Sequence, residues 1–375
     1  MAVLTEEQTM LRDAAKGWTS ESAPVAALRK LRDGKSKQSF DPAAWAEMGE
    51  MGWAGVIVPE DYDGSAFGYL GLGLILEETG RTLAASPLLS TAMIGASALQ
   101  LGGTDAQKSA WLPRIATGAA VATLAIDEGS HHNPARTALT ATKGASGYVL
   151  NGTKTFVLDG EAADLLIVAA RTRGTGMDGL TLFLVPGDAP GVTRTHLSLL
   201  DSRGAAQIAF DGVEVGADAV LGEVDKGWAV LEPVLDRAYA GLAAEMLGSA
   251  SAAFDITLDY IKTRTQFGQV IGTFQALQHR AAKWFTDIET TRSCVEAALE
   301  ALDAGNDSRA LASLAKAKAS ELVHLASNEM VQMHGGIGMT DAHDSGLFMK
   351  RARVTEALFG GASFHRDRYA RLMGF

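Results

Sequence analysis

Near its C-terminal end the chain reads Gln332-Met333-His334-Gly335-Gly336-Ile337-Gly338, and this segment ends a long helical pattern with three glycines. Glycine at such a position closes a helix with a positive φ angle, or it lets a flat ligand approach the backbone. The segment therefore predicts a helix end, and the residues around it must decide whether a ligand lies there.

A second segment starts 68 residues earlier, at Arg264-Thr265-Gln266-Phe267-Gly268, and is followed by Gly272-Thr273-Phe274-Gln275. It places a guanidinium, a side-chain amide and a loop glycine just ahead of the helical run from Leu277 to Trp284. These groups suit a diphosphate, because arginine and a helix N-terminus both attract phosphate oxygens. A loop capped by an arginine explains the same residues, so both interpretations stay open.

Both segments lie in a region of helical period that we place at residues 226–375. Apolar residues recur there at three- and four-residue spacing, as in Leu231, Val234, Leu235, Ala238 and Leu242, or Leu311, Leu314, Ala315, Ala319, Leu322 and Leu325. Long helices with few breakers predict a helical bundle.

Residues 1–118 also show a helical pattern. Thr5 and Gln8 form a capping pair ahead of the first apolar residues, and apolar residues at helical spacing predict further helices over 42–51, 70–83, 88–101 and 106–116. We therefore place a helical N-terminal domain at 1–118.

Residues 119–225 have a different texture, with short β-prone runs such as Leu165-Leu166-Ile167-Val168 and Leu182-Phe183-Leu184-Val185. Asn151-Gly152 and Asp211-Gly212 are typical turn signals between such runs. Because no helical pattern separates the runs, the sequence predicts an antiparallel sheet in this middle domain.

The composition excludes several classes of protein. The 375 residues carry 33 Lys and Arg against 44 Asp and Glu, a formal charge of −11 that repels nucleic acid and anionic membranes. No run of about 20 apolar residues predicts a membrane span. The single cysteine, Cys294, and an N-terminus without the features of a secretion signal favour a cytoplasmic location.

Common catalytic motifs are missing. The chain has no GxxxxGK[ST] loop, no HExxH and no GxSxG. His131-His132 and the pair His343 and His365 lack the spacing of metal ligands, so we expect surface or hydrogen-bonded histidines and no metal.

Taken together and in this order, the two C-terminal segments resemble the acyl-CoA dehydrogenase family. The resemblance covers essentially the whole chain and is specific for the fold. It also rests on the following segments: Val58-Pro59-Glu60-Asp61-Tyr62-Asp63-Gly64, Glu77-Glu78-Thr79-Gly80-Arg81, Tyr148-Val149-Leu150-Asn151-Gly152-Thr153-Lys154, Arg351, and Leu358-Phe359-Gly360-Gly361.

The resemblance implies an α+β fold with a helical N-terminal domain, a middle antiparallel β-barrel and a C-terminal four-helix bundle. It also implies FAD, an acyl-CoA substrate and a tetramer in which a neighbouring subunit holds the ADP half of the flavin. In the family reaction a carboxylate removes an α proton while the β hydride goes to the flavin. The residues that match cofactor-binding positions are Arg264, Gln266, Phe267, Phe274, Gln275, Gln332, Gly335, Gly336 and Phe156.

The catalytic base of the family is missing. The position of the usual Glu is Gly360, and the alternative position on the first bundle helix is Ala238. Asp236 and Glu245 are nearby acids, for which a solvated or salt-bridged carboxylate is the favoured interpretation over catalysis. The sequence therefore predicts that this chain has no catalytic residue of its own.

The flavin-facing segments depart from the family as well. Ile126-Asp127-Glu128-Gly129-Ser130-His131-His132 replaces a TEPxAGSD-like turn, Leu158 stands where a Thr usually follows the aromatic Phe156, and Ala362 replaces another hydroxyl. Each lost hydrogen bond costs on the order of 1 kcal/mol. Three of them weaken binding at this chain's own ring pocket roughly a hundredfold, since about 1.4 kcal/mol is a factor of ten.

This asymmetry resembles the base-lacking partner in α2β2 acyl-CoA dehydrogenases, whose substrates are often bulky, such as steroid side-chain thioesters. A self-tetramer stays open, as do a flavin monooxygenase or oxidase of the same fold and a non-catalytic structural relative. Electron-transfer flavoprotein is the acceptor that the resemblance implies.

Overall fold

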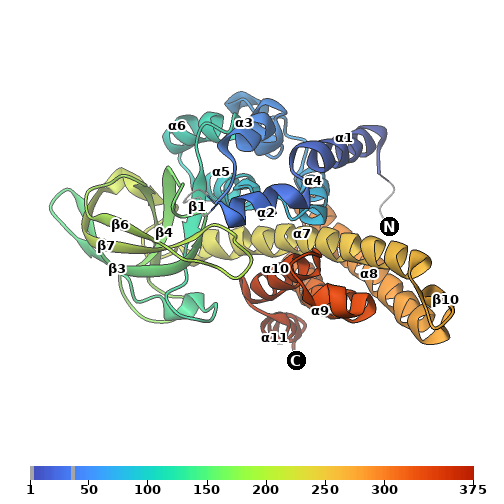
Figure 1. The fold of residues 1–375 in the computed structure, drawn as a ribbon. Helices are drawn as coiled ribbons and strands as arrows, with labels where there is room; N and C mark the ends of the chain where they lie inside the picture. The colour runs from blue at the N-terminus through green and yellow to red at the C-terminus, as the bar shows by residue number, and fades with distance from the viewer. Residues whose placement is uncertain (1–3, 35–38) are drawn as a thin grey trace. The chain divides into compact units, whose positions relative to one another are not determined.

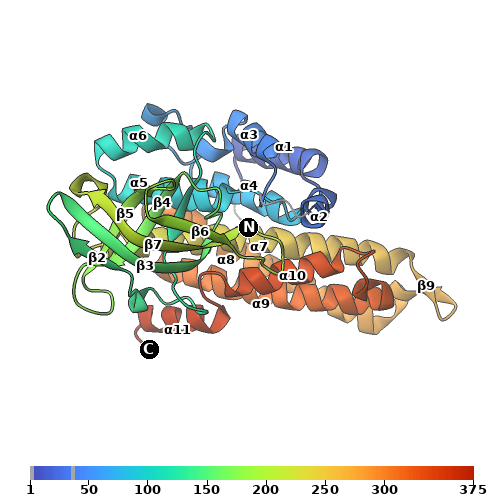
Figure 2. The same ribbon diagram turned by 60° about the vertical axis from the view of Figure 1, so that its left-hand side comes forward.

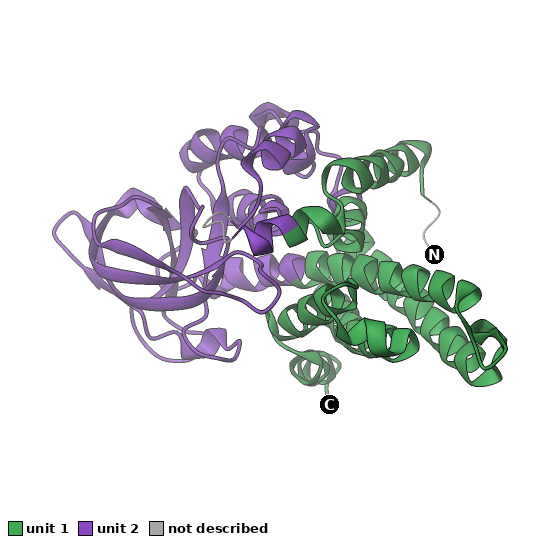
Figure 3. Ribbon diagram, in the orientation of Figure 1, with its two compact units in different colours: residues 1–29, 73–84, 239–375 green, residues 30–72, 85–238 purple. Residues whose placement is uncertain are grey.

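The computed structural model describes residues 4–34 and 39–375, and its ribbon is drawn in Figure 1. Met1–Val3 belong to the N-terminal stretch from which we predicted the absence of a secretion signal, and they lie outside the described residues. Figure 3 colours the two compact units: Met1–Arg29, Gly73–Ala84 and Tyr239–Phe375 form unit 1, and Lys30–Leu72 and Ala85–Ala238 form unit 2.

Unit 2 contains short helices whose ends follow ordinary capping rules. Helix α3 (Pro42–Glu50) starts after Asp41, whose side chain accepts from the backbone of Ala43. Helix α6 (Asp105–Ala116) starts with a capping box. The helix predicted over 88–101 begins instead as a π-helical stretch, Leu89–Gly95, and becomes α5 only at Ala96–Gly102.

The π-helical stretch packs against the first strand of the sheet. Thr91 exchanges hydrogen bonds with the backbone N–H and C=O of Ala122, both at 3.2 Å. A Cβ on Gly95 would lie 2.7 Å from the Cβ of Ala122, so the helix touches the first strand at this point. Tertiary contact with the sheet has overridden the simple helical pattern.

The sheet of unit 2 is open, so the expectation of a closed antiparallel barrel is wrong. Its strand order is β6-β7-β3-β2-β4-β5-β8, and β1 pairs with β4 in parallel. The strands are β1 (Ala122–Ala125), β2 (Thr140–Lys143), β3 (Gly147–Leu158), β4 (Leu165–Arg171), β5 (Leu180–Pro186), β6 (Val192–His196), β7 (Ala205–Gly216) and β8 (Val220–Leu221).

Two physical features explain the difference. A barrel closes only when its first and last strands pair, and the end strands here, β6 with five residues and β8 with two, are short. The sheet also contains two parallel pairs, β1 with β4 and β2 with β4, although the connections between these strands run through other strands and not through an α-helix. The absence of a helical pattern was therefore insufficient evidence for a wholly antiparallel sheet.

The two glycine pairs predicted as turns lie inside long strands. Asn151-Gly152 is part of β3, where the register with β7 shifts between Leu150 and Gly152. The side-chain oxygen of Asn151 accepts a 2.9 Å hydrogen bond from the N–H of Gly212, which lies within β7. The pattern marked a β-bulge, which uses the same conformational freedom of glycine as a turn.

Unit 1 is built mainly from helices. In Figures 1 and 2, α8 and α9 run side by side, and α10 and α11 also pack against α9. The hairpin of β9 (Thr265–Gln266) and β10 (Gln269–Val270) precedes α8. Helix bounds are α1 Glu6–Ser22, α2 Val25–Asp33, α4 Tyr69–Arg81, α7 Trp228–Thr263, α8 Gln275–Asp303, α9 Arg309–His334, α10 Ser345–Ala357 and α11 Ala362–Leu372; α2, α4 and α7 continue into unit 2.

Helices α4 and α7 approach closely through two glycines. A Cβ on Gly80 would overlap the carbonyl oxygen of Glu245, and one on Gly248 would overlap that of Glu77. The Glu77 carboxylate also accepts a 2.6 Å hydrogen bond from Arg292 on α8. The Glu77 to Arg81 motif therefore has a packing role: its glycine admits a backbone, and its acid ties two helices together.

Across residues 4–34 and 39–375, no helix is long and apolar enough to cross a membrane.

Candidate functional site

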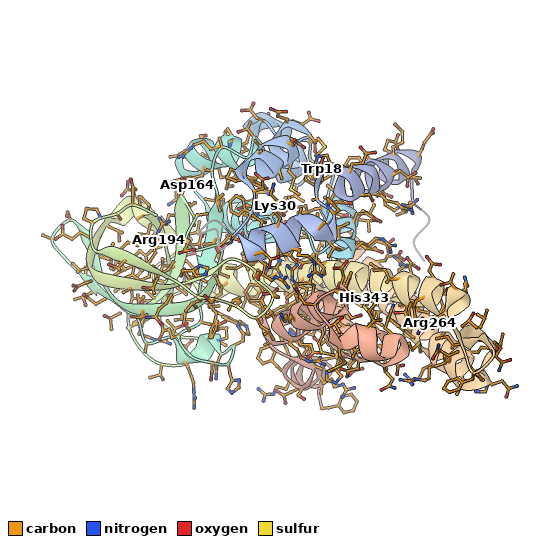
Figure 4. All side chains as sticks on the ribbon, in the orientation of Figure 1. Trp18, Lys30, Asp164, Arg194, Arg264 and His343 are labelled. Atoms are coloured by element: carbon orange, nitrogen blue, oxygen red, sulfur yellow. The ribbon has the colours of Figure 1, made fainter. Side chains whose placement is uncertain are left out.

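The second quoted segment forms an exposed hairpin at the end of α7. Phe267 and Gly268 turn the chain with φ angles of +55° and +79°, and Phe267 is 89% exposed. The hairpin is fixed by backbone hydrogen bonds from Arg264 to Tyr260 and from Ile271 to Arg264, both 2.9 Å. Arg264, labelled in Figure 4, lies on the solvent-exposed surface.

The glycine segment ends α9 as predicted. Gly335 has a φ angle of +62° and its N–H donates to the carbonyls of Val331 and Gln332. A Cβ on Gly335 or Gly336 would meet nothing within 4 Å, so space does not require glycine at either position. The positive φ angle favours glycine at Gly335 alone. The open space at Gly336 leaves room for a ligand against the backbone.

The structure places the end of α7, which leads into the hairpin, beside the end of α9. The ring of His334 lies 4.3 Å from that of Tyr260 on α7 and 4.2 Å from that of His343, which Figure 4 labels. The Tyr260 hydroxyl donates to the carbonyl of His334 at 3.4 Å. Burial lowers the pKa of His334, and its Nδ1–H donates to Met330 at 2.7 Å. A ring stack of Tyr260, His334 and His343 therefore links the end of α7 to the end of α9.

The predicted polar binding residues around this stack are exposed. Arg264, Gln266, Gln275 and Gln332 are all on the surface, and Phe274 is half-buried with its ring 6.1 Å from that of Phe267. Ile337 and Met339, on either side of Gly338, are 45% and 78% exposed. We name the surface formed by Phe267, Ile337 and Met339 with these polar residues the α7–α9 end surface.

A second group of predicted residues lies on the sheet of unit 2. Phe156 is 46% exposed and has a φ angle of +52°, an unusual conformation for a bulky residue. The register of β3 with β7 shifts between Lys154 and Val157, so Phe156 sits in a bulge. Leu158 is buried, and its carbonyl accepts from Thr123. The strand therefore exposes the ring of Phe156 to solvent and buries Leu158, the residue that we expect at the place of the usual Thr.

A buried ion pair that the sequence reasoning missed fixes the loop beside Phe156. Lys154 is fully buried and donates to the Glu128 carboxylate at 2.7 Å and to the carbonyl of Ile126 at 3.0 Å. Glu128 also accepts from the backbone N–H groups of Ala138 and Leu139. Burial lowers the pKa of Lys154, and the adjacent Glu128 opposes this shift. A lysine inside a strand was the signal, since a buried amine needs an acidic partner.

The two neighbouring histidines have no metal-binding arrangement. The Nδ1 of His132 lies 2.9 Å from the Asp127 carboxylate, which also accepts from the backbone of Asn133. His131 is exposed. No group of three or more metal-ligating side chains occurs in the part of the chain that the structure describes.

Gly360, which we predict to occupy the position of the usual base, lies in a turn between α10 and α11. Phe359 and Gly360 have φ angles of +55° and +95°. A Cβ on Gly360 would lie 2.5 Å from the ring of Phe364, so that ring fills the space into which a base would project. An adjoining cavity of about 520 Å³ is lined by Ser320, Glu321, His324, Arg353, Glu356, Ala357, Gly361 and Ala362.

The two weak acid candidates are buried, which rules out the solvated interpretation for both. Glu245 is 4% exposed and pairs at 3.3 Å with Arg351, itself 2% exposed, as the salt-bridged interpretation predicted. Asp236 is 2% exposed on α7. Ala238, the alternative base position, is completely buried.

Family models match nearly the whole chain. Those described as acyl-CoA dehydrogenase N-terminal, middle and C-terminal domains match residues 5–119, 123–213 and 225–374. A probable acyl-CoA dehydrogenase, YngJ, from Bacillus subtilis is 32% identical over 97% of this chain and 97% of its own length.

Two solved structures have closely similar folds, and the name of each joins the names of two chains. One is a variant of the Tcur3481-Tcur3483 steroid ACAD, with 32% identity, 98% of each chain covered and a TM-score of 0.89. The other is the ChsE4-ChsE5 complex from Mycobacterium tuberculosis, with 27% identity, complete coverage of both chains and a TM-score of 0.91.

Proposed function

Because the chain belongs to the acyl-CoA dehydrogenase family, whose members are oxidoreductases, we propose that it is one subunit of a FAD-dependent enzyme. The enzyme forms the α,β double bond of an acyl-CoA thioester, and a partner chain supplies the catalytic Glu. One observation carries this division of labour: the base position is a glycine with a φ angle of +95°, and a phenylalanine ring fills the space beside it.

The residues present fit FAD. On the α7–α9 end surface, Arg264 and three glutamines are exposed near the start of α8, and the backbone at Gly336 is open. Arginine and a helix N-terminus hold a diphosphate, and the amides bind polar groups of the nucleotide. When bound, FAD supplies the hydride acceptor of the reaction.

Neighbouring chains account for the exposed apolar residues of the same surface. Phe267, Ile337 and Met339 are among the large apolar side chains that the fold leaves in contact with solvent. Burying one such side chain contributes about 1.5–3 kcal/mol. A second subunit that covers them beside Arg264 is consistent with an ADP moiety held across a subunit interface.

On the sheet of unit 2, the pocket that would hold this chain's own flavin ring retains an exposed aromatic residue but lacks hydroxyl groups that could donate hydrogen bonds to the ring. Phe156 presents an aromatic face in a strained bulge, and the Lys154–Glu128 pair holds the adjacent loop in place. The hydroxyls expected at Leu158 and Ala362 are absent. We infer that this pocket binds flavin weakly and that the productive flavin lies mainly in the partner's pocket.

The similar proteins support a heteromeric assembly with a bulky substrate. Both structural relatives described above are named as chain pairs, and one is a steroid enzyme. A heterotetramer with one related dehydrogenase chain, and a substrate such as a steroid side-chain thioester, is therefore the proposal. Electron-transfer flavoprotein is the proposed acceptor.

Co-expression tests this function. The chain should be produced alone and together with a dehydrogenase encoded beside it, and each preparation assayed for acyl-CoA oxidation with an artificial electron acceptor. We expect activity only from the co-purified pair, and we expect the partner's Glu→Gln variant to abolish it. A lone preparation that oxidises acyl-CoA at the rate of the pair would refute the proposal.

A further inference from the structure

The turn at Phe359 and Gly360 is clamped by two buried side chains. Lys316 on α9 donates from Nζ to the carbonyl of Gly360 at 3.0 Å. His365 on α11 donates from Nε2 to the carbonyl of Phe359 at 3.0 Å. Both side chains belong to residues that are 0% exposed. Two successive carbonyls of one turn are thus each held from inside the bundle.

The backbone of this turn needs such support. Phe359 adopts a left-handed conformation at +55°, directly before Gly360 at +95°. A non-glycine residue in that region costs of order 1–3 kcal/mol and persists only where its surroundings over-determine it. The two clamping side chains are the surroundings that do so here.

Lys316 lacks a carboxylate partner at ion-pair distance among the described residues. Its other contacts are the hydroxyl of Ser320 at 3.1 Å and the carbonyl of Glu356 at 3.4 Å. The Glu356 carboxylate instead contacts His324 and Arg353, both at 3.0 Å. A buried amine with neutral partners is costly, so nothing in packing alone favours a lysine at this place.

The clamp borders the cavity beside the missing base. Ser320 and Glu356, which contact Lys316, line that cavity together with Gly361 and Ala362, which follow the clamped turn. A shift of the turn therefore moves one wall of the cavity. Lys316, which is buried inside the bundle, therefore contacts residues that determine the shape of this cavity wall.

We propose that Lys316 is a positioning residue, whose buried amine holds the Phe359–Gly361 turn and the adjoining cavity wall in place when it is protonated and releases them when it is neutral. Three acceptors surround its Nζ, and an ammonium group has three protons to donate, whereas a neutral amine has two. Burial lowers the pKa of Lys316 to about 7, and Glu356 on α10 opposes that shift. Of the other titratable neighbours, His365 on α11 is bonded to Phe359 and His324 on α9 to Glu356.

Hydrogen exchange of the purified chain tests the clamp without any activity measurement. The peptide covering 357–365 is followed by mass spectrometry in the wild type and in Lys316→Met, Ser320→Ala and Lys318→Met. Lys318 is the matched control, because it lies on the same helix with its side chain 30% exposed. We expect at least tenfold faster exchange of this peptide in Lys316→Met, a smaller increase in Ser320→Ala and no change in Lys318→Met.

Unchanged exchange of this peptide in Lys316→Met, or an equal increase over the whole chain, would overturn the clamp. If Lys316→Met fails to fold, Ser320→Ala decides: exchange that rises only in 357–365 supports the clamp, and exchange that does not rise there overturns it.

The pH dependence of the same exchange tests the role of the proton on Lys316. After correction for the intrinsic pH dependence of amide exchange, we expect exchange of the 357–365 peptide to rise at least fivefold from pH 6 to pH 8 in the wild type and in Lys318→Met, and to stay constant in Lys316→Met. Corrected exchange that does not change over this range in the wild type overturns the positioning role.

Discussion

At the scale of single residues, the position at which we predict the loss of the base is unusual in its backbone as well as in its chemistry. Gly360 does more than lack a carboxylate, since its φ angle of +95° and the Phe364 ring leave no room for a larger side chain. The neighbouring Gly361 differs, with an ordinary φ angle of −83° and its nearest Cβ contact, Glu356 O, at 3.6 Å. That this chain lacks a base stays a prediction from the sequence, whereas the filled space beside Gly360 is seen only in the structure.

Restoring the acid by Gly360→Glu should therefore destabilise the chain. Left-handed backbone costs roughly 1–2 kcal/mol for a non-glycine residue, and overpacking adds about 1–3 kcal/mol. Urea unfolding measures the loss, with Gly361→Ala as a control that we expect to change stability by less than about 1 kcal/mol. The double variant Gly360→Glu/Phe364→Ala should recover the overpacking part. A stable Gly360→Glu chain that is a fast dehydrogenase by itself would contradict our account of the pocket.

The buried amine of Lys316 gives a stability prediction of its own. Its pKa is about 7 in the fold against 10.5 for the free group, so between these values the unfolded chain binds a proton that the folded chain lacks. As the pH is lowered from 9.5 to 7.5, the contribution of Lys316 should therefore reduce the free energy of unfolding by about 1.4 kcal/mol for each pH unit. Below pH 7 the reduction should level off. Unfolding of wild type and Lys316→Met at several pH values measures the difference. Parallel pH dependences would show that the amine is not titrating as described.

At the scale of elements, helices were more predictable than the sheet. The Thr5 and Gln8 capping box and the break at Gly335 were readable, because both depend on local backbone groups. The strand runs were found, but Asn151-Gly152 became a bulge, and β2 and β6, rich in polar residues, were missed. Sheet closure depends on which distant strands pair, and no local pattern reports that. The domain boundaries at 118 and 225 stay a prediction.

The candidate site divides in the same way. The sequence predicted that the Arg264 and Gly335 segments act together, and the Tyr260–His334 contact places the helix turn that precedes Arg264 beside the end of α9. Their role in binding a flavin stays a prediction. The Lys154–Glu128 pair and the Lys316 clamp were missed, because an isolated lysine in a sequence does not show that it is buried or what it faces.

Arg264 provides the element-scale test of cofactor binding. Arg264→Ala should weaken FAD binding to the assembled enzyme by about 2 kcal/mol, the value of a charged hydrogen bond. Arg173→Ala is the control, since that arginine is 73% exposed on the sheet unit. Fluorescence titration of the flavin-depleted assembly measures both. Equal affinity in wild type and Arg264→Ala would remove this arginine from the site.

The apolar tip of the hairpin tests the subunit contact. Phe267→Ser changes a side chain that is 89% exposed, so the stability of the chain should change by less than about 0.5 kcal/mol. Assembly should weaken, because the ring is then unavailable for burial at the interface. Analytical ultracentrifugation compares this variant with Met10→Ser, a 65% exposed control on α1. A tetramer of undiminished stability would place the hairpin outside the interface.

At the scale of the whole molecule, we propose a subunit that is specialised to complete another chain's site. The surface that we propose to serve a neighbour carries an arginine, side-chain amides and exposed apolar residues. The residues that we predict to face this chain's own flavin ring include Leu158 and Ala362, which carry no hydroxyl, and an aromatic ring fills the space beside Gly360. Retention of one half and loss of the other is what a heteromeric division of labour predicts.

Counting the flavin tests this claim most directly. The chain and its co-purified partner are isolated as one assembly, and bound FAD is measured by absorbance against the concentration of each chain. Our account predicts two FAD for every four chains, with a lower content after purification when Arg264→Ala weakens the nucleotide site. Four tightly bound FAD in a tetramer of this chain alone, with thioester oxidation, would contradict it.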